Sequence, residues 1–174
     1  KSVSVSISVA SLVPKPFTPF QWEPQDKPDV LIEKQNYLVS CVKTKKVNVS
    51  RHVPWTSFLE GVFARGDRKL NKALLEAHKQ GVKFDSWAEF FSYEKWMEIF
   101  KSCGIDPDFY ATRKREYDEV LPWDHISVGV SKNFMINENK KAYESLTTPN
   151  CKEKCSGCGA NRLGKELTWC PNKQ

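Results

Sequence analysis

The chain has 174 residues, of which 40% are hydrophobic, so it can bury one real core with at most a small appendage. No apolar run approaches the length of a membrane span, which excludes a membrane-spanning helix and favours a cytoplasmic protein without a membrane partner. The formal net charge is +6, but acidic residues are interspersed, so a nucleic-acid-binding face is the less favoured reading.

The first ten residues alternate between apolar and hydroxyl side chains, which predicts a β-strand. Its apolar face would carry Val3, Val5, Ile7 and Val9. The rest of the chain offers few strands to pair with it. We therefore expect the chain to be part of a larger protein, with association possible through the open edge of this strand.

Residues 11–25 contain four prolines between Pro14 and Pro24, which exclude a helix or a central strand. Aromatic residues lie among these prolines. The segment is either a rigid connection packed over a core or a loop at the mouth of an active site, and the sequence leaves both open.

Residues 26–146 are expected to be mostly helical. The first helix would start at an Asp26 cap with Pro28 in its first turn and end near Lys45, and a short strand would follow over residues 46–51. Its buried stripe would comprise Leu31, Ile32, Leu38, Val39 and Val42. A turn around Pro54 would lead to a helix that begins at a Ser57–Glu60 capping box.

Further along, four residues are expected to cap helices: Asp67, Ser92, Asp106 and Ser131. Gly81 and Gly104 would end two of these helices. Residues 87–91 should form a short helical piece. The spacing of Tyr93, Trp96, Met97 and Phe100 favours one buried face over a surface that stacks nucleic-acid bases.

Several polar residues of the helical region could have either a functional or a purely structural role. Arg65 could clamp an acidic substrate group, but with Glu60 and Asp67 it more often forms an internal ion pair and a helix cap. His52 and His125 could titrate near neutrality, although a histidine beside tryptophan is usually packed. His78 should face solvent.

Four cysteines crowd the last quarter of the chain, at Cys151, Cys155, Cys158 and Cys170. Four thiolates with such spacing can ligate a zinc ion or an iron–sulfur cluster. The run Cys155-Ser-Gly-Cys158-Gly-Ala predicts a knuckle in which backbone N–H groups point at sulfur. Gly157 and Gly159 would supply the positive φ angles that this tight loop requires.

Two disulfides are the alternative. No secretory leader is visible, and the chain has only six cysteines in 174 residues, so a metal site is favoured over disulfides. The cysteines alone do not decide between zinc and iron. His125 is the substitute ligand if Cys170 is not the fourth. Only 16 residues follow Cys158, which is too few for a catalytic domain that begins at this motif. The Cys-x3-Cys-x2-Cys is therefore expected to be an auxiliary or structural site.

Four segments together resemble the C-terminal half of the cobalamin-binding-type radical S-adenosylmethionine proteins, a family of Fe–S oxidoreductases. The segments are Val9–Trp22, Leu59–Asp67, Leu121–His125 with Gly129–Lys132, and Thr148–Gly159. They occur in the family's order and span nearly the whole chain.

The resemblance implies an α+β, mostly helical fold in three regions. Residues 1–25 would be the closing strand and exit loop of a partial β/α barrel, 26–146 a helical domain, and 147–174 a cysteine-rich tail. The catalytic [4Fe–4S] motif, the S-adenosylmethionine contacts and any cobalamin domain are absent. The chain should therefore be catalytically incompetent alone, with the N-terminal catalytic region of the same protein as its partner.

A zinc-stabilised module that binds RNA or a protein partner is the alternative from another functional class. It predicts a colourless protein that carries one zinc ion, and RNA binding that weakens with salt.

Overall fold

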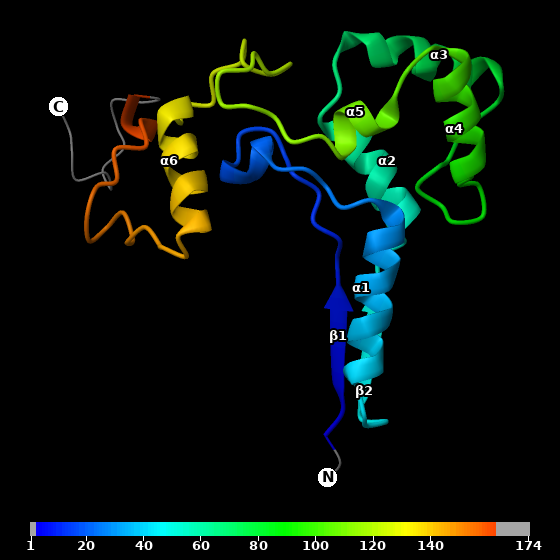
Figure 1. Cartoon of the computed structure of the whole chain (residues 1–174), viewed down its shortest axis with the longest axis horizontal. Helices are drawn as coiled ribbons and strands as arrows, with labels where there is room; N and C mark the ends of the chain where they lie inside the picture. Colours follow the sequence, from blue (N-terminus) through cyan, green and yellow to red (C-terminus); the bar gives the residue numbers. More distant parts are fainter. Residues whose placement is uncertain (1–2, 163–174) are drawn as a thin grey trace. The chain divides into compact units, whose positions relative to one another are not determined.

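The computed structural model describes residues 3–162, and these fall into two compact units (Figure 1). Unit 1 comprises residues 1–14 and 24–114, and unit 2 comprises residues 15–23 and 115–174, each within the described range.

Unit 1 begins with a parallel pair of strands, β1 (Val5–Val9) and β2 (Val47–Arg51). The register pairs Val5 with Val47 and Val9 with Arg51. Parallel strands require a crossover, and α1 (Pro28–Cys41) lies between them in the chain. The short strand predicted over residues 46–51 is confirmed as β2, and its pairing leaves β1 open along one edge rather than two in the described residues. Only these two strands form a sheet in the described residues, so a barrel remains a prediction.

The start and end of α1 differ from the sequence-based expectation. Lys27, not Asp26, occupies the N-cap position, and it makes no side-chain cap bond. Pro28 lies in the first turn, as predicted, where its φ suits a helix and its missing N–H needs no partner. The helix ends at Cys41, and Pro28 and Leu31 are its buried residues, so most of the expected stripe is at least partly exposed.

Helix α2 (Pro54–Ala64) begins three residues before the predicted capping box. Pro54 again holds the first helical position, so Ser57 lies inside the helix, where it is buried. The predicted capping box at Ser57 is therefore wrong. Gln25 fixes the segment before α1 to this helix, because its Nε2 donates to the Ser57 carbonyl at 2.8 Å.

Four predicted caps are confirmed. Asp67 accepts from the Lys69 amide before the 3-10 helix Arg68–Leu70 and α3 (Asn71–Lys79). Ser92 caps α4 (Tyr93–Ser102), and Asp106 caps α5 (Pro107–Ala111). In unit 2, Ser131 caps α6 (Lys132–Tyr143).

The core of unit 1 is apolar and lies among α2, α3, α4 and α5 (Figure 1). Trp96 and Phe100 are buried and Tyr93 and Met97 pack against them, which confirms the predicted face of α4. The predicted helical piece over residues 87–91 is wrong. These residues form turns, in which Trp87 is 62% exposed.

Unit 2 has a smaller apolar core around Trp22, Leu121, Trp123 and Met135. Trp22 lies in the 3-10 helix Pro19–Trp22, and Met135 lies on α6. The described part of the unit ends at the 3-10 helix Ala160–Arg162. Much of this unit is loop, so hydrogen bonds from side chains are needed to hold the backbone of its loops in place.

The described residues are mostly helical with a small parallel sheet, which agrees with the expected α+β class. None of the helices in the described part is long and apolar enough to cross a membrane.

Candidate functional site

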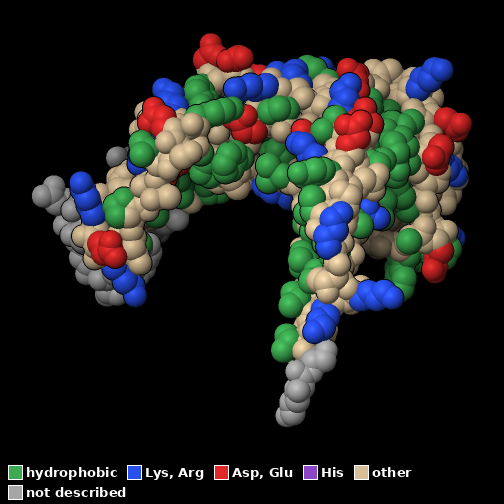
Figure 2. Space-filling model, turned by 60° about the horizontal axis from the view of Figure 1, so that its bottom comes forward, with side chains coloured by type: hydrophobic (Ala, Val, Ile, Leu, Met, Phe, Trp, Pro, Cys, Tyr) green, Lys and Arg blue, Asp and Glu red, His purple; other side chains and the backbone are tan. Residues whose placement is uncertain are grey.

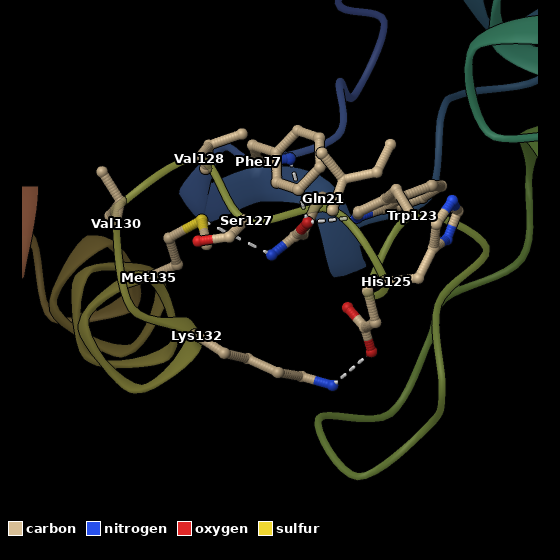
Figure 3. A pocket seen from close by; sticks show the side chains of 11 residues that line it. Phe17, Gln21, Trp123, His125, Ser127, Val128, Val130, Lys132 and Met135 are labelled. Carbon is tan, nitrogen blue, oxygen red and sulfur yellow. Dashed lines mark hydrogen bonds and ion pairs between the residues drawn. The ribbon is translucent and has the colours of Figure 1, made fainter. Parts of the chain in front are cut away.

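The amide of Gln21 lies at the centre of unit 2 and is only 2% exposed. Its Oε1 accepts from the Phe17 backbone N–H at 3.0 Å and from the Trp123 indole N–H at 2.7 Å. Its Nε2 lies 3.6 Å from the Met135 sulfur. One side chain therefore joins the proline-rich loop, the Leu121–His125 turn and helix α6 (Figure 3).

An ion pair between Asp124 and Lys132 lies beside this amide. The Lys132 ammonium donates to Asp124 Oδ2 at 3.0 Å and to the Glu119 carbonyl at 3.1 Å. The same carboxylate oxygen accepts from the Leu121 backbone N–H at 3.0 Å, which closes the turn. The pair thus fixes the start of α6 to residues 119–124.

These groups border a pocket with a volume of about 370 Å³. In the view of Figure 3, Met135 and Val130 lie on one side of the open space and Trp123 and His125 on the other, with Gln21 above and Lys132 below. The side chains come from residues 17–21, 123–130 and α6. The Pro/aromatic loop therefore lines a pocket through Phe17 and Gln21, while its Trp22 packs in the core of unit 2, so both predictions for this loop stay open.

A second buried amide, Asn139 on α6, holds the other end of the proline-rich loop. Asn139 is 0% exposed; its Nδ2 donates to Glu23 at 3.1 Å, and its Oδ1 accepts from the Tyr117 hydroxyl. The Tyr117 ring packs edge-on against Trp22 with 5.2 Å between centroids. Helix α6 thus contacts residues 15–23 through two buried amides, Gln21 and Asn139.

The predicted cysteine knuckle is confirmed over residues 155–160. The Gly157 amide lies 3.5 Å from Cys155 Sγ, and the Ala160 amide lies 3.5 Å from Cys158 Sγ. Gly157 has φ of 71° and Gly159 has φ of 95°. Hydrogen bonds of this kind would offset the negative charge of a coordinated thiolate, and metal binding by the two sulfurs stays a prediction.

The knuckle packs closely on the turn that precedes α6. The Ser131 backbone N–H donates to the Cys158 carbonyl at 2.8 Å. A Cβ on Gly159 would lie 3.0 Å from the Gly129 carbonyl oxygen, so this approach requires glycine. The knuckle is therefore anchored to the same turn that carries Lys132.

Cys151, the third described cysteine of the predicted metal set, does not form a ligand group with the knuckle. Cys151 is exposed, in a turn that Asn150 organises by accepting from the Lys152 amide at 3.0 Å. Cys170 lies outside the described residues. No group of three or more potential metal ligands occurs within residues 3–162, and none of the five cysteines there is disulfide-bonded.

The Arg65 guanidinium lies in the interior of unit 1, with 0% exposure, and donates to the Ala111 and Arg113 carbonyls. A substrate clamp would need an accessible cleft, so the structural reading of Arg65 is the better one. Asp67 accepts from the Tyr110 hydroxyl as well as capping a helix. Glu60 is exposed.

The three histidines do not come together as a catalytic group. His52 and His78 are exposed on unit 1, and His125 is exposed on unit 2. Of these, only His125 lines a described pocket, the one beside Gln21. Its expected role as a substitute ligand for Cys170 stays a prediction.

Lys and Arg side chains are mixed with Asp and Glu over most of the face seen in Figure 2. A nucleic-acid-binding surface normally gathers positive charge in one stripe or patch. The view therefore gives no specific support to an electrostatic RNA-binding face.

Gln21 and Asn139, which organise unit 2, were not predicted from the sequence. A long polar side chain between two aromatics, as Gln21 lies between Phe20 and Trp22, is the one local signal of a buried amide there. Their partners are distant in the chain: Gln21 and Trp123 are 102 residues apart, and Glu23 and Asn139 are 116 apart.

Comparisons with known proteins identify no relative. No family model, curated protein or solved structure matches the chain.

Proposed function

We propose that this chain is the C-terminal portion of a radical S-adenosylmethionine Fe–S oxidoreductase, and that it carries an auxiliary or structural metal site. The cysteine knuckle is the observation that supports the proposal most. Two thiols of the predicted set, Cys155 and Cys158, each accept a backbone N–H, and the glycines between and after them adopt the required angles.

The arrangement of unit 2 adds support. Three of the four segments that resemble the family lie at least partly in this unit, and they contact one another. Gln21 binds Trp123, which joins the first segment to the Leu121–His125 segment. Ser131 binds Cys158, which joins that region to the cysteine segment. Mutual contact is expected if these segments build one site.

Thiolates suit a soft metal or a cluster, and Cys155 and Cys158 would supply two ligands, with Cys151 and Cys170 proposed as the others. When bound, an iron–sulfur cluster would supply one-electron chemistry, whereas zinc would supply a structural cross-link. The residues of the chain hold the sulfurs, direct N–H groups at them and anchor the loop to α6. Hydrogen abstraction from substrate belongs to the catalytic region of the full-length protein.

Metal and sulfide analysis of the chain, purified without oxygen, tests the site. We expect one metal centre per chain, lost in Cys158→Ser and retained in the control Cys41→Ser, because Cys41 lies at the end of α1 in unit 1. Brown protein with acid-labile sulfide supports the proposal. Colourless protein with one zinc ion and salt-sensitive RNA binding supports the binding-module alternative, and equal metal content in both variants contradicts both.

Production of 5′-deoxyadenosine by the full-length protein tests the family assignment separately. A filled catalytic cluster that gives no cleavage of S-adenosylmethionine would contradict it.

A further inference from the structure

No cysteine of the described residues lines the pocket beside Gln21, and the pocket has the size of a small-molecule site. Its volume of about 370 Å³ lies at the lower end of the range for ligand pockets, roughly 300–1,000 Å³. That volume suits one ring or two fused rings with a small substituent. All of the lining residues belong to unit 2.

The lining of the pocket is mixed, with polar atoms contributing slightly more than half of it, and its apolar part is formed by Phe17, Trp123, Ile126, Val128, Val130 and Met135. Phe17 has φ of 58°, an unusual backbone angle for a residue with a side chain, and its N–H is held by Gln21. Such strained residues cluster at ligand sites. Aromatic and thioether walls favour a planar ring.

The polar rim consists of a donor beside an acceptor. Lysine has three N–H donors, and Lys132 uses two of them on Asp124 and Glu119, which leaves one. Asp124 accepts both of its bonds through Oδ2, so within the described part of the chain its Oδ1 has no hydrogen bond. His125 and Ser127 add side chains that can donate or accept.

The charges of Lys132 and Asp124 cancel, and this selects against ionic ligands. An anion attracted to the ammonium would be repelled by the carboxylate 3.0 Å from it, and a cation would meet the reverse. A neutral amide edge matches both groups at once. Its carbonyl accepts from Lys132, and the adjacent N–H donates to Asp124.

We propose that this pocket binds a neutral planar heteroaromatic ring with an amide edge, as found in uracil and hypoxanthine. The ring lies against the aromatic and Met135 walls, and its amide edge meets Lys132 and Asp124. A free nucleoside and an unpaired base in a single strand present the same chemistry.

NMR titration of the full chain with inosine and adenosine tests the ring edge. The two nucleosides share a bicycle, but adenosine lacks the ring N–H and the carbonyl. We expect inosine and uridine to shift the Trp123 indole and Met135 methyl signals saturably, and adenosine to bind at least about tenfold more weakly. No shift with inosine or uridine at about 10 mM, or equal affinity for adenosine, would overturn the proposal.

Lys132→Met removes the donor, and we expect it to lower inosine affinity about tenfold. Lys141→Met is the matched control, because Lys141 also lies on α6 and pairs with Glu138 at 2.8 Å without lining the pocket. An unchanged Trp123 indole signal in the ligand-free variants shows that unit 2 is folded. Equal losses in both variants would contradict the assigned edge.

Comparing uridine with a short oligouridylate separates the two sources of the ring. Tighter binding of the oligonucleotide identifies a strand as the ligand, and equal binding identifies the free nucleoside. Both results support the ring pocket, because each requires that uridine itself binds.

Discussion

The largest fully buried side chains of unit 1 are mostly apolar and include Phe100 and Ile99, together with the charged Arg65. Those of unit 2 include Trp22 and two amides, Gln21 and Asn139. Unit 1 gains most of its stability from apolar surface removed from water, which requires packing but little direction. Unit 2 depends on hydrogen bonds whose buried partners must all be satisfied. A polar interior fixes loop geometry more strictly than an apolar one, which suits a unit that lines a pocket and anchors a cysteine knuckle.

The apolar side of this comparison predicts the largest loss of stability. Phe100→Ala should lower the free energy of unfolding of unit 1 by about 3–5 kcal/mol, because Phe100 is 0% exposed. Phe90→Ala, at a ring that is 55% exposed, should change it by less than about 1 kcal/mol. Urea unfolding followed by circular dichroism measures both, and equal losses would mean that the core is misplaced.

The polar side predicts a smaller but specific loss. Gln21→Met keeps the side-chain length and removes the acceptor used by Trp123 and Phe17, so unit 2 should lose about 1–3 kcal/mol. Gln80→Met is the control, because the Gln80 side chain is exposed and bonds only Glu76. The Trp123 indole signal should move in the first variant and stay in the second. An unchanged free energy of unfolding in Gln21→Met would contradict the proposal that buried amides stabilise unit 2.

The knuckle offers a matched pair of glycines within unit 2. Alanine at either position must adopt a positive φ, at a cost of about 1–2 kcal/mol. Gly159→Ala also meets the Gly129 carbonyl at 3.0 Å, whereas a Cβ at Gly157 meets nothing within 4 Å. Hydrogen exchange at the Ser131 amide should therefore accelerate more in Gly159→Ala. Equal exchange in the two variants would show that the knuckle does not rest on this turn.

The smallest expected effect is a loss of stability at low pH, caused by protonation of Glu138. Hydrogen bonds from Lys141 and Thr148 lower the pKa of Glu138 below its usual value. A carboxylate whose pKa is lowered by folding stabilises the protein above its unfolded pKa of about 4.3, and this contribution is lost as the pH falls through the lower folded pKa. Thr148 signals in an NMR titration should follow that loss. Glu138→Gln should abolish the dependence, and its persistence would place the cause elsewhere.

Features that depend on a few neighbouring residues were predictable from sequence. The caps at Asp67, Ser92, Asp106 and Ser131 and the cysteine knuckle are of this kind, because turn and cap chemistry is local. Two predicted caps, Asp26 and Ser57, were wrong for one shared reason: Pro28 and Pro54 begin α1 and α2 without a side-chain cap.

The pocket of unit 2 could not be predicted. Its central bonds join Gln21 to residues more than a hundred positions away, and no local pattern encodes such a pairing. Whether Cys151 and Cys170 complete a metal site also depends on chain closure over a distance rather than on spacing alone.

Ser131 connects the cysteine knuckle to the pocket beside Gln21. Its side chain caps α6, its backbone N–H binds the Cys158 carbonyl, and the next residue is Lys132. A change in how tightly the sulfurs are held would therefore be transmitted through one peptide unit to the rim of the ring pocket. Thermodynamic reciprocity then requires that a bound ring alter metal retention by the same factor as the metal alters ring affinity.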